Sequence, residues 1–137
     1  MNKTKLHNKA LNYKKALIRL EEASHYDVAV GLNLDGLIQR FEFTMELAWK
    51  LIKSYLEEKG DDVPIHGSKD AVRRAFSLAL IEEPGIWLKM INDRNTLSHT
   101  YDEKEAFEIA GKIKAVYLPE LKKLDHVLTP LITDEID

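Results

Sequence analysis

The sequence of 137 residues contains no cysteine, which excludes a disulfide framework and a thiolate metal site and is compatible with a reducing compartment. Its six glycines are scattered, so the chain has no glycine-rich phosphate loop. No apolar run approaches membrane-spanning length, and the first residues lack the apolar core of a signal peptide. We therefore expect a soluble, cytoplasmic protein.

Other familiar sites are also missing. The five histidines show neither of the helical spacings typical of zinc proteins, so no metal and no cofactor is expected. Gly67 and Ser68 resemble the start of a nucleotidyltransferase motif, but no D-x-D pair of aspartates follows them, which excludes that enzyme. The net charge of −3 excludes a broadly basic protein and predicts that any contact with RNA is local.

What the sequence does contain is helical periodicity, and no segment shows the alternation of a strand. The pattern predicts helices over residues 8–23, 33–59 and 68–80, the last with Ser68 as N-cap. A fourth helix is expected from Pro84 onward, and a fifth over residues 101–128 with a kink near Pro119. Residues 128–137 are expected to form a frayed tail. The sequence thus predicts a single all-α domain over residues 1–137, an up-and-down bundle of about five helices.

The long helix predicted over residues 33–59 has the features of an interface. Phe43, Leu47 and Trp49 lie outside its main apolar face, and a helix that is apolar on more than one side is either central to a bundle or packed against another chain. Homodimerisation is the simpler explanation. The candidate contacts with a sister subunit or another partner are Asp35, Gln39, Glu42, Phe43, Glu46 and Trp49. The alternative for the polar members is a solvated stripe in which Glu46 pairs with Lys50.

The segment RNTLSHTY, residues 94–101, brings a guanidinium, an imidazole and a phenol together. On one continuous helix, Arg94 and His99 point roughly 140° apart. They can converge on one phosphate if the helix breaks between them or if a second chain supplies one of them. The sequence favours a break, because Thr100 and Glu103 match a capping box. In that arrangement Arg94 ends one helix and His99 precedes the next.

These side chains suit metal-free cleavage of RNA, in which the 2′-hydroxyl attacks the adjacent phosphorus. A histidine moves protons near neutral pH, and an arginine stabilises negative charge on the phosphorane oxygens. Asn95, Ser98 and Tyr101 are candidates for positioning the substrate, and Tyr101 is also a candidate for modification. The alternative is that the segment forms only a polar joint between two helices.

Two stretches resemble known proteins. RNTLSHTY fits the R-x4-H-x-Y pattern of HEPN domains, all-α proteins paired with minimal nucleotidyltransferases. DGLIQRFEFTMELAWKLIKSYLEEKG is similar to the long second helix of the branch of nucleotidyltransferase substrate-binding proteins. The resemblance covers essentially the whole chain. It implies a dimeric, metal-independent ribonuclease toxin of the HepT type, with Arg94 and His99 catalytic at the dimer interface and tRNA or mRNA as substrate. It also implies a cognate nucleotidyltransferase antitoxin that adenylylates Tyr101 and blocks cleavage.

The same resemblance supports a second function. In it the protein is a noncatalytic subunit that presents a substrate or nucleotide to a nucleotidyltransferase, and Arg94 and His99 bind a phosphate without cleaving it. A helical module that only binds other proteins is the third alternative.

Overall fold

The computed structural model describes residues 3–99 and 102–136, and this part of the chain contains helices and no strand. In chain order the helices are α1 (Lys3–Ala23), α2 (Gly31–Glu58), α3 (Ser68–Ser77) and α4 (Pro84–His99). Then α5 (Glu103–Lys112), the π-helical segment η1 (Ile113–Tyr117) and α6 (Leu118–Ile136) follow one another without interruption. The last three form one helical rod, so the prediction of an all-α bundle of about five helices is confirmed.

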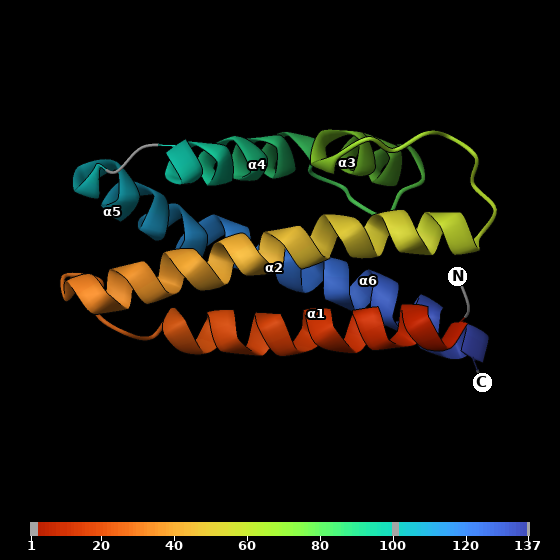
Figure 1. The fold of residues 1–137 in the computed structure, drawn as a ribbon, viewed down its shortest axis with the longest axis horizontal. Helices are drawn as coiled ribbons and strands as arrows, with labels where there is room; N and C mark the ends of the chain where they lie inside the picture. Colours follow the sequence, from red (N-terminus) through yellow and green to blue (C-terminus); the bar gives the residue numbers. More distant parts are fainter. Residues whose placement is uncertain (1–2, 100–101, 137) are drawn as a thin grey trace.

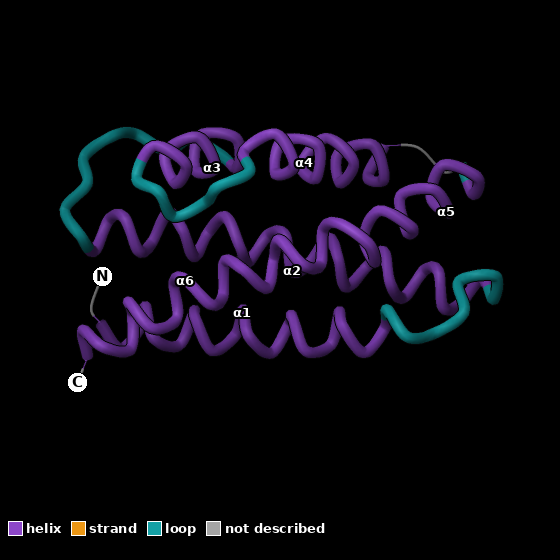
Figure 2. Tube along the Cα trace, turned by 180° about the vertical axis from the view of Figure 1, so that it is seen from behind, coloured by secondary structure: helices purple, strands orange, loops and turns teal. Residues whose placement is uncertain are grey.

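The long helices α1, α2 and α6 lie side by side, and α3 and α4 cover α2 on its other side (Figure 1). Two contacts show that α1 and α2 are antiparallel. The Lys9 ammonium donates to the Ser54 hydroxyl at 2.8 Å, whereas the Arg40 guanidinium donates to the carbonyl of Arg19 at 2.8 Å. The first residues of α1 and the last residues of α6 lie at the same end of the bundle (Figure 2).

The core lies where α2 meets the other helices. The apolar face predicted for α2 is buried, with eight members at 7% exposure or less. Those eight are Leu34, Leu37, Phe41, Met45, Ala48, Ile52, Tyr55 and Leu56. The Phe41 ring stacks on that of Tyr117 from η1 with 5.7 Å between the centroids, and the buried Tyr13 hydroxyl donates to the Leu121 carbonyl at 2.6 Å. These contacts join α2 and α1 to the last helical rod.

The ends of several helices differ from the prediction, most of all those of α1 and α3. The first helix begins at Lys3, earlier than residue 8. The N-cap of α3 is Gly67 and not Ser68. Just before the helix, the backbone N–H of His66 donates a hydrogen bond to the Asp70 carboxylate at 2.9 Å. The predicted end at residue 80 was wrong because Ala79 adopts a left-handed conformation with φ of 61°, which ends α3 at Ser77. Glycine usually marks such a position, so an alanine gave no signal.

The kink near Pro119 stays a prediction, and the carboxyl-terminal rod contains the π-helical segment η1 just before that residue. Proline has no N–H to donate four residues back and its ring crowds that carbonyl, and η1 directly precedes this position. Within the segment predicted to be a tail, α6 continues through Ile136 with Pro130 inside it. Leu128 and Ile132, one turn apart, are 0% and 1% exposed, and their burial offsets the hydrogen bond that Pro130 lacks. None of the described helices is long and apolar enough to cross a membrane.

Candidate functional site

Arg94 and His99 lie on the same helix, because α4 continues through His99. The predicted break between them was therefore wrong. The next helix begins at Glu103, and its N-cap is Asp102, whose side chain accepts from the backbone N–H groups of Lys104 at 3.0 Å and Glu105 at 3.4 Å. Aspartate is a common N-cap residue, and the helix predicted to begin at residue 101 begins at Glu103. Thr100 and Tyr101 lie outside the described residues.

The position of the break changes how the site can be built. Residues five apart on one helix point roughly 140° from each other. Arg94 faces α2, and His99 is exposed at the carboxyl end of α4. Within one chain the two side chains thus leave the helix in different directions. The remaining way to bring both to one phosphate is a second copy of the chain.

The guanidinium of Arg94 is held by a carboxylate of α2. Its Nη2 lies 3.0 Å from Oε2 of Glu46, which also accepts from the Trp49 indole at 3.1 Å. The other Glu46 oxygen lies 3.2 Å from the Lys50 ammonium, so the predicted Glu46–Lys50 pair is present. Desolvation by burial alone raises the pKa of Glu46, but the Trp49 and Lys50 hydrogen bonds and the Arg94 charge outweigh it and lower the pKa. Glu46 is therefore an anion that already occupies the arginine.

The Nε of Arg94 is buried and has no hydrogen-bond partner among the described residues. A buried N–H without a partner costs free energy, and an incoming oxygen acceptor would remove that cost. Arginine binds phosphate through two parallel N–H groups. The arginine thus keeps one donor unused while another is bound to Glu46.

One turn further along α4, Ser98 makes a second contact with α2. Its hydroxyl lies 3.1 Å from Oε2 of Glu42 and 3.1 Å from the carbonyl of Arg94. Together with the Arg94–Glu46 pair, this contact fastens the end of α4 to α2. Asn95 is exposed on α4 and available to solvent or to a bound molecule.

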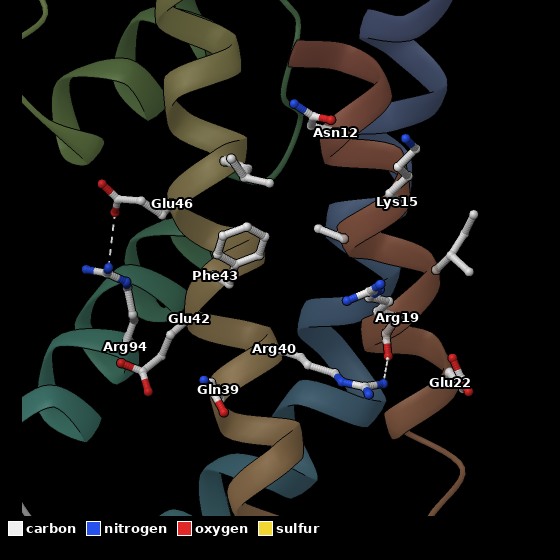
Figure 3. Close-up of a pocket in the computed structure, with 13 residues that line it drawn as sticks. Asn12, Lys15, Arg19, Glu22, Gln39, Arg40, Glu42, Phe43, Glu46 and Arg94 are labelled. Atoms are coloured by element: carbon white, nitrogen blue, oxygen red, sulfur yellow. Dashed lines mark hydrogen bonds and ion pairs between the residues drawn. The ribbon is translucent and has the colours of Figure 1, made fainter. Parts of the chain in front are cut away.

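Arg94 borders an open groove of about 1000 Å³ that runs across α2 to α1 (Figure 3). Gln39, Glu42, Phe43 and Glu46 line it from α2. The Phe43 ring is 60% exposed, as expected for a residue outside the buried face of α2. Of the other proposed interface residues, Asp35 is exposed, and Trp49 is half-buried and packs partly against the core. The structure thus brings Arg94 together with four of the six predicted interface residues.

Sequence reasoning missed one polar contact beside the site. The Tyr117 hydroxyl of η1 donates to Asp93, the neighbour of Arg94, and the Lys112 ammonium lies 3.7 Å from the same carboxylate oxygen. Burial first, and then the hydrogen bond and negative charge of Asp93, raise the pKa of Tyr117 well above its ordinary value. The contact fixes α4 against the last helical rod. No local pattern marks it, because its two members are 24 residues apart and belong to different helices.

Across residues 3–99 and 102–136, no three carboxylate or imidazole side chains gather closely enough to hold a metal ion. The chemistry available at the described site is that of Arg94, His99, Ser98, Asn95 and the nearby carboxylates.

Comparison with known proteins places this fold. Residues 8–130 match the family model described as "Nucleotidyltransferase substrate binding protein like". The chain is 30% identical over 107 residues to "Probable ribonuclease HepT" of Haemophilus influenzae, and the match covers 73% of each protein. Among solved structures, it is similar to a protein from Thermus thermophilus with a TM-score of 0.71 and 31% identity, over 88% of this chain and 98% of that one.

A second similar structure comes from Haemophilus influenzae and is described as having the fold of a substrate binding domain of a nucleotidyltransferase. Its TM-score is 0.64 at 27% identity, and the match covers 91% of this chain and 97% of that one. The family model spans most of the sequence and the fold agrees with both solved structures. The chain therefore belongs to the HepT-like family of nucleotidyltransferase substrate binding proteins.

Proposed function

We propose that this protein is a metal-independent endoribonuclease whose site combines Arg94 and His99 from two copies of the chain. The observation that carries the proposal is their placement on α4, where Arg94 borders the groove and His99 is exposed at the helix end. The 30% identity to a protein described as a probable ribonuclease supports the same reaction.

The reaction assigns one role to each side chain. His99 accepts the proton of the ribose 2′-hydroxyl as that oxygen attacks the neighbouring phosphorus. The Arg94 guanidinium stabilises the charge that develops on the equatorial oxygens, and the phosphate replaces Glu46 as its partner. The imidazolium then returns the proton to the 5′-oxygen as the phosphorus–oxygen bond breaks. The products are a 2′,3′-cyclic phosphate and a 5′-hydroxyl, so no water is consumed.

A homodimer is part of the proposal, since a twofold axis can bring Arg94 of one copy near His99 of the other. The exposed Phe43 on the same face provides an apolar anchor for such an interface. Asp35, Gln39, Glu42 and Glu46 supply polar contacts around it for the sister subunit or another protein.

We also place the protein in a toxin–antitoxin pair in the cytoplasm. Its partner is a cognate minimal nucleotidyltransferase that transfers AMP to Tyr101, which lies two residues after His99. An AMP group there adds bulk and negative charge beside the site, which opposes the binding of RNA. Mass spectrometry of Tyr101 after incubation with that enzyme and ATP tests this part separately.

The decisive experiment compares cleavage of tRNA and mRNA in EDTA by the wild type, Arg94→Ala and His99→Ala. Removing a general base or a charge-stabilising group typically lowers the rate by about 10²- to 10⁴-fold. His126→Ala and Arg73→Ala are matched controls, because both residues are exposed and lie on other helices. We expect the wild type and the controls to leave 2′,3′-cyclic ends. Equal activity in all five proteins would indicate a contaminating nuclease and refute the proposal.

The second candidate function is a noncatalytic subunit that binds a nucleotide for a nucleotidyltransferase. The solved Haemophilus influenzae structure, described as a substrate binding domain, favours it. In that case the Arg94 donors bind a nucleotide phosphate, and His99→Ala leaves every measured activity unchanged. Calorimetric titration with ATP separates the two candidates. The alternative requires that the wild type binds ATP, that Arg94→Ala abolishes this binding and that the protein cleaves no RNA.

A further inference from the structure

The groove that begins at Arg94 ends at three cations on its far side. Lys15 and Arg19 lie on α1, and Arg40 lies on α2 opposite them; we call these three residues the cationic strip. We propose that the cationic strip binds the phosphate backbone of single-stranded RNA on one side of the phosphate held by Arg94. The identity of the ligand as a substrate rests on the proposed function, whereas binding to the strip does not require cleavage.

The charges of the strip are not neutralised by carboxylates. Within the described part of the chain, the side chains of Lys15 and Arg19 have no hydrogen bond or ion pair. Arg40 donates to the backbone carbonyl of Arg19, a neutral partner that leaves the guanidinium charge uncompensated. All three side chains are exposed. By contrast, Lys14 and Lys122, at the contact of α1 with α6, lie within 3.5 Å of Asp125 and Glu21.

The carboxylates at the α4 edge of the groove lie apart from the strip. Glu46 is paired with Arg94, whereas Glu42 contacts the neutral Ser98 hydroxyl and keeps its charge. Glu22 is the carboxylate that lines the groove beside the strip, which contains three cations. A chain with a net charge of −3 thus carries a local excess of positive charge along one side of one groove. Such a local excess attracts a polyanion without a basic protein as a whole.

The geometry fits a strand better than a single small anion. Lys15 and Arg19 are one turn apart on α1, so they are separated by about 6 Å along the helix. The side chains of Arg19 and Arg40 both enter the space between α1 and α2, while Arg94 approaches from the other side of α2 (Figure 3). Lys15 and Arg19 can therefore follow a strand along α1, beside the dimer interface proposed around Phe43, as in proteins whose grooves follow a single-stranded backbone.

The test measures binding of an RNA that cannot be cleaved. A 2′-O-methyl RNA oligonucleotide of mixed sequence lacks the attacking hydroxyl, so its affinity is independent of the catalytic step. The variant is Lys15→Gln/Arg19→Gln, and the matched control is Lys69→Gln/Arg73→Gln on α3. The control residues are also a lysine and an arginine four apart, exposed and without an ion pair among the described residues. Fluorescence anisotropy at several salt concentrations gives both the affinity and its salt dependence.

We expect the strip variant to bind about 10- to 25-fold more weakly at about 0.1 M salt. The reason is that each phosphate contact with a single strand contributes about 0.7 to the slope of log affinity against log salt, and the variant loses two such contacts. The slope should fall by about 1.4 in the strip variant and change little in the control. Equal losses in the two variants would show a nonspecific charge effect and overturn the proposal, as would undetectable binding by the wild type.

A second measurement distinguishes RNA from another copy of the chain as the occupant of the strip. If the strip variant changes from dimer to monomer in light scattering, the strip is a protein interface and the proposal is overturned. Failure of the proposed function has a different signature, since Arg94→Ala and His99→Ala then leave cleavage unchanged while the strip variant still loses binding. Loss of binding with an unchanged oligomeric state supports the strip whether or not the protein cleaves RNA.

Discussion

Glu46 of α2 holds the guanidinium of Arg94 from α4 at 3.0 Å, in the position that we propose for a phosphate oxygen. Trp49 and Lys50 contact the same carboxylate and keep it ionised by lowering its pKa against the opposing effect of desolvation. The free protein thus carries an internal anion at the proposed phosphate site. An RNA that binds to Arg94 must displace it.

We therefore expect Glu46→Gln to bind RNA about 1.5- to 5-fold more tightly than the wild type, because an ion pair at a partly exposed position contributes about 0.2–1 kcal/mol. Glu57→Gln is the control, since Glu57 is an exposed carboxylate on the same helix. Anisotropy with a 2′-O-methyl RNA measures the effect. Weaker binding by Glu46→Gln, comparable to that of Arg94→Ala, would show that Glu46 orients the arginine instead of competing for it.

The shared site predicts complementation between two inactive variants. When Arg94→Ala and His99→Ala chains are refolded together, half of the dimers are mixed, and each mixed dimer contains one site with both groups intact. We expect about a quarter of the wild-type cleavage rate from the mixture of a symmetric dimer. Each variant refolded alone is the control. No recovery in a mixture that does contain mixed dimers would mean that each site belongs to one chain.

The dimer interface can be tested at Phe43. Because this side chain is 60% exposed in the chain, Phe43→Asp should leave the helical content and the folding of the monomer unchanged. Burying its carboxylate in an apolar interface is costly, so the variant should be monomeric and inactive. Phe107→Asp, at a position 51% exposed on α5, is the matched control and should remain dimeric. Light scattering measures the mass, and a dimeric Phe43→Asp would place the interface elsewhere.

The contact between Tyr117 and Asp93 predicts a pH-dependent effect on stability. Tyr117→Phe should lower the free energy of unfolding at neutral pH by about 1 kcal/mol, the typical contribution of one hydrogen bond. The folded-state pKa of Tyr117 is raised, so its contribution is fully present below the unfolded-state pKa and is lost as the pH rises above it. The difference between wild type and variant should therefore shrink above about pH 10.

Urea unfolding followed by circular dichroism measures that difference at each pH. Tyr55→Phe is the control, because burial alone raises the pKa of Tyr55 and its hydroxyl has no hydrogen bond among the described residues. Its effect at neutral pH should be smaller than that of Tyr117→Phe. An effect of Tyr117→Phe that stays constant from neutral to alkaline pH would contradict the role assigned to the hydrogen bond.

Some helix ends followed from local signals and others did not. Pro84 begins α4 as predicted, because a proline at the first helical position needs no N–H partner. The end of α3 at Ser77 depends on a left-handed alanine, which no sequence rule marks. The sequence offered two residue types that can cap α5, Thr100 and Asp102, and the structure has Asp102 as the N-cap.

The sequence by itself determined most of the helices, the buried face of α2 and which residues are candidates to bind a phosphate, because these follow from side-chain type and a period of 3.6 residues. Only the tertiary structure decided their relations. It set Glu46 on Arg94, tied Asp93 to Tyr117 and arranged the cationic strip across the groove. Each of these contacts joins helices that are distant along the chain, and packing of the whole bundle, not local periodicity, fixes which side chains meet.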